Sequence, residues 1–410
     1  MLDKEVLSGG QQSVDAPSSR TLGSTSEAGR DPVVTSVATL LPGRIDPDLV
    51  AAAARAWSAN SKRAFLADLS VWRDWCRRIQ VDVADAKPQH VVTFLQRCSQ
   101  PWLLDGDGQE RIHADGSRVK NPDLRAVATL ARYLVNIATA YRWAGLPSPT
   151  QSELVKLEMK ALRRARGTAQ RQAHPLRFKG EVQDLAHDPP AGICIARLLQ
   201  APHRDWTGRV DWLGLRDRAM LLVAYDTALR ASELVAVEVE HIEGPGRDGS
   251  GLLFIPQSKT DQEGEGRHAY LSRKTMEAIA GWRQATKVAT GPLFRSIRFH
   301  PDGSPRELLR KAVRADSVPG IYRRIVRQAW EQGALPDISE AQLEKLLPAI
   351  KGHSTRVGVA QDNFAAGEDL PAIMQAYGWK DTRTVLRYGK KLAARSGAAS
   401  RLAAKVWGEE

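Results

Sequence analysis

The sequence has few of the residues and runs that mark several common protein classes. It contains only three cysteines in 410 residues, and none of them belongs to a C-x-x-C pair. This odd, widely spaced set argues against a disulfide framework and against a cysteine-based zinc site. No apolar run approaches the roughly 18 residues of a membrane span, and the first residues lack the apolar stretch of a signal peptide. We therefore expect no membrane partner and a cytoplasmic location.

Motifs of nucleotide-dependent and metal enzymes are also missing. The sequence has no G-x-x-x-x-G-K-[ST] phosphate loop and no H-E-x-x-H, and its nine histidines show no metal-ligand spacing. The run Gly244-Pro245-Gly246-Arg247-Asp248-Gly249 has the letters of a dinucleotide fingerprint. A proline interrupts it, however, and β-like sequence follows it where a helix is required. We interpret this run as a turn and predict no cofactor and no metal.

Positive charge is what the sequence has in excess. Its 59 Lys and Arg residues outnumber 47 Asp and Glu residues, which gives a net charge of +12. Because residues 1–44 hold four basic and five acidic residues, the rest of the chain carries +13. A folded part this basic favours a polyanion, most often nucleic acid, through neutralisation of phosphates. Many soluble proteins are basic without such a partner, so charge alone leaves the partner open.

The chain is long enough for two or more domains. Residues 1–44, rich in Ser, Gly, Thr and Ala without periodicity, predict a disordered tail. The helical period that follows predicts a helical bundle over residues 45–166. The polar stretch 167–174 predicts a linker, and residues 175–410 a second domain. Insertion-like stretches at 101–121 and 334–352 are long for connections between helices.

Amphipathic helices with basic outer faces characterise the first predicted domain. Phe65, Leu69, Trp72, Cys76 and Ile79 form one apolar stripe. Leu154, Leu157 and Ala161 form another, which ends in a basic cluster. We expect helices near 60–80 and 122–145 to enter the major groove if the partner is duplex DNA. Six basic residues are the predicted nucleic-acid contacts: Lys62, Arg63, Arg73, Arg77, Arg163 and Arg164.

The second predicted domain mixes helices with a little strand. Short β-like runs at 252–256 and 267–271 flank a polar segment, which predicts an antiparallel hairpin. Most of the remainder has the helical period. The expected fold class is therefore mainly α, with a helical bundle followed by an α+β domain that contains a small antiparallel sheet.

Four separated fragments of the second domain form the most specific pattern of the sequence. They are Ala228-Leu229-Arg230-Ala231-Ser232-Glu233-Leu234, Ser258-Lys259-Thr260, His353-Ser354-Thr355-Arg356-Val357-Gly358, and Gly378-Trp379 followed by Leu386-Arg387-Tyr388. In this order they resemble the tyrosine recombinase (phage integrase) family. The runs 353–360 and 373–379 look closest to its Cre-like branch. The resemblance implies that the second domain is the catalytic domain of this family.

The residue types in these fragments suit the chemistry that the resemblance implies. Cutting a phosphodiester without a metal needs a nucleophile, a proton donor for the leaving oxygen and cations around the transition state. Arginine suits the last task because its planar fork pairs with two phosphate oxygens and keeps its proton. The resemblance implies these roles: Tyr388 as nucleophile, Arg230 and Arg356 as the phosphate clamp, Lys259 as the acid, His353 and Trp379 as oxyanion donors, His353 also as a candidate base, and Glu233 as an orienting group.

Each of these residues also has a plain structural explanation when it is taken alone. Arg230 could cap a helix end, Lys259 could be solvated and Trp379 could be core packing. Tyr388 competes with Tyr377, which lies in an apolar helix. In the family the nucleophile follows the Trp or His of this last fragment by nine positions, which favours Tyr388.

The resemblance further implies how such a protein acts on double-stranded DNA. It would cut and rejoin DNA at inverted-repeat sites through a 3′-phosphotyrosyl link, as homodimers that pair into a homotetramer, in association with the nucleoid. A terminal helix at about 392–407, with Leu402, Val406 and Trp407 on one face, would dock on a neighbouring subunit or fold back on its own domain. A type IB topoisomerase-like enzyme and a non-catalytic DNA-binding protein with the same fold stay open as alternatives.

Overall fold

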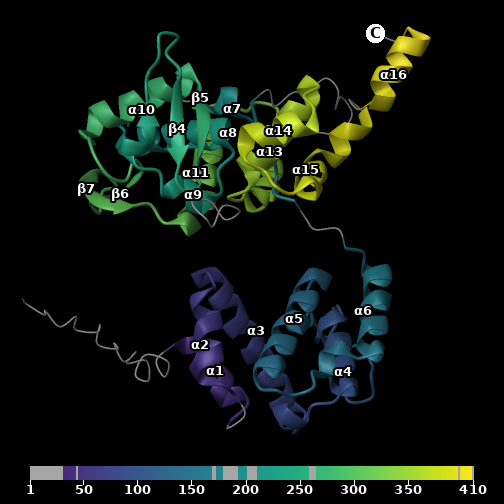
Figure 1. The fold of residues 1–410 in the computed structure, drawn as a ribbon. Coiled ribbons are helices and arrows are strands. Elements are labelled where there is room, and N and C mark those ends of the chain that lie inside the picture. Colours follow the sequence, from purple (N-terminus) through teal and green to yellow (C-terminus); the bar gives the residue numbers. More distant parts are fainter. Residues whose placement is uncertain are drawn as a thin grey trace, which may run out of the picture. The chain divides into compact units, whose positions relative to one another are not determined.

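The computed structural model describes residues 31–42, 45–168, 172–178, 193–200, 210–257, 265–395 and 398–408. The chain divides into two compact units, Met1–Gln170 (unit 1) and Arg171–Glu410 (unit 2). Figure 1 shows helices throughout and strands in unit 2. This composition confirms the expected fold class. No helix in the described ranges is both long and apolar enough to cross a membrane.

Unit 1 consists of helices, several of which begin with a side-chain cap. Asp46, Ser58 and Ser152 each accept a backbone N–H of the helix that follows, which satisfies amide groups left over at a helix start. Between the fourth and fifth helices, residues 101–121 form only isolated β-bridges. The helices are α1 (Pro32–Leu40), α2 (Pro47–Arg55), α3 (Ala59–Arg78), α4 (Pro88–Ser99), α5 (Val127–Trp143) and α6 (Glu153–Arg166), with 3₁₀ turns at Val83–Asp85 and Pro149–Gln151.

Helix α1 corrects the prediction of a disordered tail that reaches residue 44. It is capped by Asp31, whose Oδ1 accepts the Val33 amide at 2.8 Å. Val33, Val34 and Val37 are buried in the same apolar core as the longer helices. A helix of nine residues is too short to show a clear period in the sequence, and it is stabilised by packing. The prediction for residues 1–30, 43 and 44 lies outside the described residues.

Helix α6 buries a different face from the one predicted. Val155 and Met159 are buried, whereas Leu154 and Leu157 are 45% and 55% exposed. The predicted stripe was therefore wrong by one position, which is a rotation of about 100°. Because α6 carries two apolar rows, its packing against α4 decides which of them is covered.

Unit 2 carries its strands in three small sheets within the described residues. β1 (Leu176–Arg177) pairs in parallel with β2 (Ile193–Cys194), while β3 (Ile242–Glu243), β4 (Gly251–Ile255) and β5 (Arg267–Leu271) are antiparallel. The β4–β5 pair, in which Leu253 faces Ala269, confirms the predicted hairpin. A second antiparallel pair joins β6 (Arg295–Phe299) to β7 (Pro305–Ala312).

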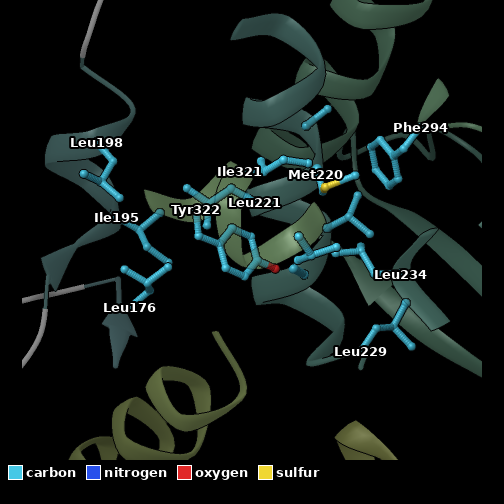
Figure 2. Packing of buried hydrophobic residues seen from close by; sticks show 14 of the residues in the cluster. Leu176, Ile195, Leu198, Met220, Leu221, Leu229, Leu234, Phe294, Ile321 and Tyr322 are labelled. Carbon is cyan, nitrogen blue, oxygen red and sulfur yellow. The ribbon is translucent and has the colours of Figure 1, made fainter. Parts of the chain in front are cut away.

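Helix α8 lies at the centre of unit 2. Its residues Met220 and Leu221 pack with Ile321 and Tyr322 of α11 and with Leu234 of α9 (Figure 2). A helix that is apolar on all sides is a core helix. The helices of this unit are α7 (Ile195–Leu198), α8 (Trp212–Thr227), α9 (Ala231–Val235), α10 (Arg273–Thr286), α11 (Val318–Glu331), α12 (Glu340–Leu346), α13 (Ser354–Ala366), α14 (Leu370–Tyr377), α15 (Thr382–Arg395) and α16 (Ala398–Trp407).

Residues 172–174, predicted as part of the linker 167–174, belong to unit 2. The His174 amide donates to the Ala349 carbonyl at 2.9 Å, and Ala173 is buried. This part of the prediction was wrong, because the backbone partner lies 175 residues further on and leaves no trace in a polar segment. The terminal helix also differs from its predicted bounds. α15 extends to Arg395, and a separate α16 begins at Ala398.

Candidate active site

The C-terminal end of α8 is the framework of the candidate site. Ala228, the residue after this helix, has a left-handed backbone with φ of +47°. A non-glycine residue in this region is strained, and such strain often accompanies function. The turn directs the chain into α9, and the Ala228 carbonyl accepts a hydrogen bond from Arg356 Nη1. Two of the predicted arginines, Arg230 and Arg356, thus meet at this turn.

Arg230 is held by Glu233. Glu233 Oε2 accepts the Arg230 amide at 2.9 Å, and Glu233 Oε1 accepts Arg230 Nη1 at 2.7 Å. The first bond caps the start of α9, and the second fixes the guanidinium. The Arg230 side chain is 24% exposed and that of Glu233 only 9%. Glu233 therefore orients an arginine that still faces solvent.

Arg356, in the first turn of α13, is only 3% exposed. Its Nε atom has no hydrogen-bond partner in the described part of the chain. Burial and the like charge of Arg230 lower the pKa of Arg356, and Tyr388 and Glu233 oppose this change. A buried cation next to another cation is costly without an anion. An anion bound at these two arginines would relieve both effects.

Trp379 connects the buried arginine to the candidate nucleophile. Its ring centroid lies 5.2 Å from Arg356 Cζ and 6.0 Å from the Tyr388 ring, which meets it edge-on at 67°. The indole is 6% exposed, and its Nε1 has no partner among the described residues. An unpaired buried donor is unusual in a folded protein and calls for an explanation. A ligand oxygen that approaches Nε1 would satisfy it.

The two candidate tyrosines differ in what their hydroxyl groups contact. The Tyr377 hydroxyl accepts a hydrogen bond from Asn363 Nδ2 at 3.1 Å, and burial raises the pKa of Tyr377. The Tyr388 side chain instead lies near Arg356, and their interaction opposes the lowering of the Arg356 pKa. Of the two, Tyr388 therefore adjoins the group that would bind a phosphate, which is where a nucleophile is needed.

The two other predicted site residues are placed less directly. His353 is exposed at the N-cap of α13, three positions before Arg356 and hence on the same face of the helix. Lys259 lies outside the described residues, between β4 and β5. The structure thus brings together five of the seven predicted residues: Arg230, Glu233, Arg356, Trp379 and Tyr388.

Sequence reasoning did not single out Arg267, the first residue of β5. Burial lowers its pKa, and the charges of Glu233 and Arg230 also act on it, which places its side chain near both. Nothing in the sequence marked it except its position at the start of a β-like run. Its neighbourhood depends on the packing of β5 beneath the turn before Trp379.

The predicted nucleic-acid contacts in unit 1 fall into two groups. Lys62 forms an ion pair with Asp31 at 3.0 Å, Arg63 donates to Asn60, and Arg73 and Arg77 both pair with Asp74. Two acidic residues, Asp31 and Asp74, thus pair with three of these four basic residues. Arg163 and Arg164 are exposed in the last turn of α6 and form no ion pair within the described ranges.

Residues 194–395 match the model of the phage integrase family. The recombinase Cre of Escherichia phage P1 is 27% identical over 351 residues, which cover 85% of this chain and 89% of that protein. An integrase/recombinase XerD homologue of Selenomonas ruminantium is 25% identical over 80% of this chain and 81% of its own. A crystal structure of the XerH site-specific recombinase bound to a palindromic difH substrate covers 88% of this chain and 84% of its own, with 13% identity and a TM-score of 0.49.

Proposed function

The chain belongs to the phage integrase family of tyrosine recombinases, and from this premise we propose that it cuts and rejoins duplex DNA at specific sites. The observation that carries the proposal is the grouping of Arg230, Arg356, Trp379 and Tyr388. It combines a nucleophile, two guanidinium groups and an unpaired indole N–H. Phosphodiesters are anions that such a set of donors recognises.

The proposed reaction is a transesterification at phosphorus. The Tyr388 hydroxyl oxygen attacks the scissile phosphate and gives up its proton to His353. The bond from phosphorus to the 5′ oxygen breaks, and Lys259 donates a proton to that oxygen. A 3′-phosphotyrosyl link and a free 5′ hydroxyl result. Because the link conserves the energy of the broken ester, a 5′ hydroxyl can reverse the step on the same or another strand without ATP.

The side chains around the phosphate divide the remaining work. Arg230 and Arg356 bind the two non-bridging oxygens, whose charge increases in the transition state. Trp379 Nε1 and His353 donate further hydrogen bonds, and Glu233 fixes Arg230. These fixed cations take the place of a metal ion in neutralising the phosphorane. Removal of one such donor typically costs about 100- to 1,000-fold in rate.

We also propose the assembly in which the reaction takes place. Dimers bind the inverted-repeat arms of one site, and two sites pair in a tetramer that exchanges strands in two rounds. Leu402, Val406 and Trp407 of α16 are 61%, 61% and 75% exposed, which supports docking of this helix on a neighbouring subunit. Unit 1 contributes phosphate contacts, among which Arg163 and Arg164 are exposed and lie side by side at the end of α6. This activity fits a cytoplasmic protein at the nucleoid.

Covalent capture tests the proposal. The wild-type protein would be incubated with a library of nicked duplexes that carry random inverted repeats, and DNA that stays attached to protein after denaturation would be sequenced. The nick lets the cleaved strand diffuse away, so that the phosphotyrosyl adduct accumulates. We expect selected sites with inverted symmetry and an adduct on a peptide that contains Tyr388.

Variants of the two tyrosines provide the control. Tyr388→Phe should bind the selected duplex and form no adduct, and Tyr377→Phe should still form one. An adduct that maps to Tyr377 contradicts the nucleophile assignment. Relaxation of supercoiled plasmid without any site preference would instead favour a topoisomerase-like enzyme.

A further inference from the structure

Arg267 lies at an unusual position in unit 2. It opens β5 opposite Ile255 and directly follows the segment that contains Lys259. Its half-buried side chain donates from Nη2 to the Thr227 carbonyl, the last residue of α8, at 3.5 Å. Its Nη1 atom is buried and has no partner in the part of the chain that is described. The described residues therefore satisfy few of the N–H donors of the Arg267 guanidinium.

The guanidinium of Arg267 packs directly beneath the turn that leads to Trp379. Gly378 has a φ of +61°, and a methyl group on its Cα would lie 2.5 Å from Arg267 Nε and 2.7 Å from Arg267 Cδ. The turn therefore needs glycine for two reasons, its left-handed backbone and the close approach of this arginine. Arg267 therefore lies against the residue that precedes Trp379.

Arg267 also shares the electrostatic surroundings of the candidate site. Glu233 and Arg230 both act on its charge, and Arg356 binds the carbonyl of Ala228 next to that of Thr227. The end of α8, which carries partial negative charge, thus receives two arginines from different elements. With Arg230, three arginines face a single carboxylate, Glu233, so that two positive charges are left for a bound anion.

As a packing residue, an arginine is a poor choice at this position. A methionine would fill the same volume without desolvating a charge and without repulsion from Arg230. Exposed charges can be held at little cost, but this one is half-buried and adjoins another cation. The charge and the planar fork therefore need a reason beyond packing.

We propose that Arg267 is a positioning residue for strand cleavage, which holds the Gly378–Trp379 turn against the end of α8 and so fixes the Trp379 ring against Arg356 and Tyr388. The proposal rests on the proposed function. It implies that Trp379 Nε1 reaches a phosphate oxygen only while Arg267 is in place. It also links the strand that follows Lys259 to the turn that carries Trp379.

Single-turnover cleavage of the selected nicked duplex tests this role. We expect Arg267→Met to form the adduct about 100-fold more slowly, because small displacements of a donor cost this much, with duplex affinity within about threefold of wild type. Arg267→Lys should recover part of the rate, since it restores the charge but not the fork. Loss of folded protein would lower the amount of adduct, whereas loss of positioning lowers the rate constant.

Arg218 provides a matched control. It is also a half-buried arginine of unit 2 whose pKa is lowered by burial, and it donates to a single backbone carbonyl, that of Leu199, at 3.1 Å. It is ten positions before Ala228 on α8, about 15 Å along the helix. Arg218→Met should cleave at the wild-type rate constant. An equal loss in both variants would show a general effect of buried arginines and overturn the proposal.

A double-mutant cycle and a spectroscopic signal separate the possible outcomes. If Arg267 acts through Trp379, Arg267→Met should cost little more in a Trp379→Phe background, and additive losses overturn the proposal. In protein labelled with 5-fluorotryptophan, Arg267→Met should shift the Trp379 resonance, which Trp379→Phe identifies; an unchanged resonance overturns the proposal as well.

A wild type that forms no adduct overturns the proposed function and this role with it. A wild type and an Arg267→Met variant that cleave equally fast overturn only the role of Arg267.

Discussion

Two buried charges, Asp68 in unit 1 and Arg356 in unit 2, have opposite surroundings. In unit 1, Asp68 is 2% exposed and fully paired: Arg132 donates to both of its oxygens at 2.8 Å, and Asn136 adds a third bond at 2.7 Å. In unit 2, Arg356 is 3% exposed, retains an unpaired Nε and lies near another arginine. The first arrangement is complete without a ligand, and the second lacks an anion.

This difference distinguishes a buried charge that stabilises the fold from one that binds a ligand. A buried charge that is part of the framework has its partners within the fold, because an unpaired one costs several kcal/mol. A buried charge that binds a ligand is left incomplete, and the rest of the unit tolerates its cost. Unit 2 has a large apolar core centred on α8 (Figure 2), and α13, the helix of Arg356, contacts α8. Four changes test this contrast.

The largest effect is expected from Arg356→Ala. It should slow single-turnover cleavage about 1,000-fold, since a donor to the transition state is lost. The thermal midpoint should change little, or rise, because an uncompensated buried cation is removed. Quenched-flow or manual sampling of adduct formation measures the rate, and calorimetry the midpoint. A large fall in the midpoint with an unchanged rate per folded molecule would show that Arg356, like Asp68, stabilises the fold and does not serve the reaction.

Asp68→Asn should have the opposite profile. We expect a loss of about 3 kcal/mol in the free energy of unfolding of unit 1, because Arg132 loses its paired charge. At a temperature where the variant is folded, cleavage of the selected duplex should proceed at the wild-type rate constant. Urea unfolding followed by circular dichroism measures the first quantity. A slow rate constant in fully folded variant would show that the ion pair serves the reaction.

Removal of two unpaired surface charges should have a smaller effect. In the double variant Arg163→Gln/Arg164→Gln, duplex affinity should fall about tenfold, and the slope of log affinity against log salt should flatten by about 2. The matched double variant Arg73→Gln/Arg77→Gln should change affinity less, since these two arginines share an ion pair with Asp74. Fluorescence anisotropy over a salt series tests both. Equal slopes in the two variants would contradict the prediction that arginines without ion pairs contribute more to DNA binding than paired ones.

The smallest effect concerns His174, at the start of unit 2. Burial lowers the pKa of His174 below its ordinary value of 6.5. The unfolded chain then binds this proton more tightly than the folded one, so stability that is present above the ordinary value is lost as the pH falls through it. We expect His174→Gln to reduce the decline of the thermal midpoint between about pH 7 and about pH 5. A decline of the same size in the variant would assign it to other groups.

Much of the fold followed from the sequence where the period was long. α3 extends over 20 residues, and four of the five residues in its predicted stripe are buried. The β4–β5 hairpin was equally clear, because alternating apolar runs flank a polar segment. The failures were short or ambiguous elements: the nine-residue α1, and α6, where two apolar rows compete. In both α1 and α6, contacts with segments distant in the sequence determine which residues are buried.

The candidate site divides in the same way. Local motifs named Arg230, Arg356, Trp379 and Tyr388, since each lies within a short fragment of recognisable order. They did not name Arg267, whose importance depends on Gly378, more than 100 residues away, and on the end of α8. Motifs also gave no indication that Asp31 and Asp74 offset basic residues on α3.

The amino-acid sequence alone determined which chemical groups the protein contains, the helical period of its longest segments and its excess of positive charge. These are local properties, and each can be read within a window of a few turns. The tertiary structure decided which charges are paired and which are left incomplete. Whether a guanidinium meets a carboxylate, a carbonyl or another guanidinium depends on contacts between distant segments, and burial then multiplies the energetic consequence.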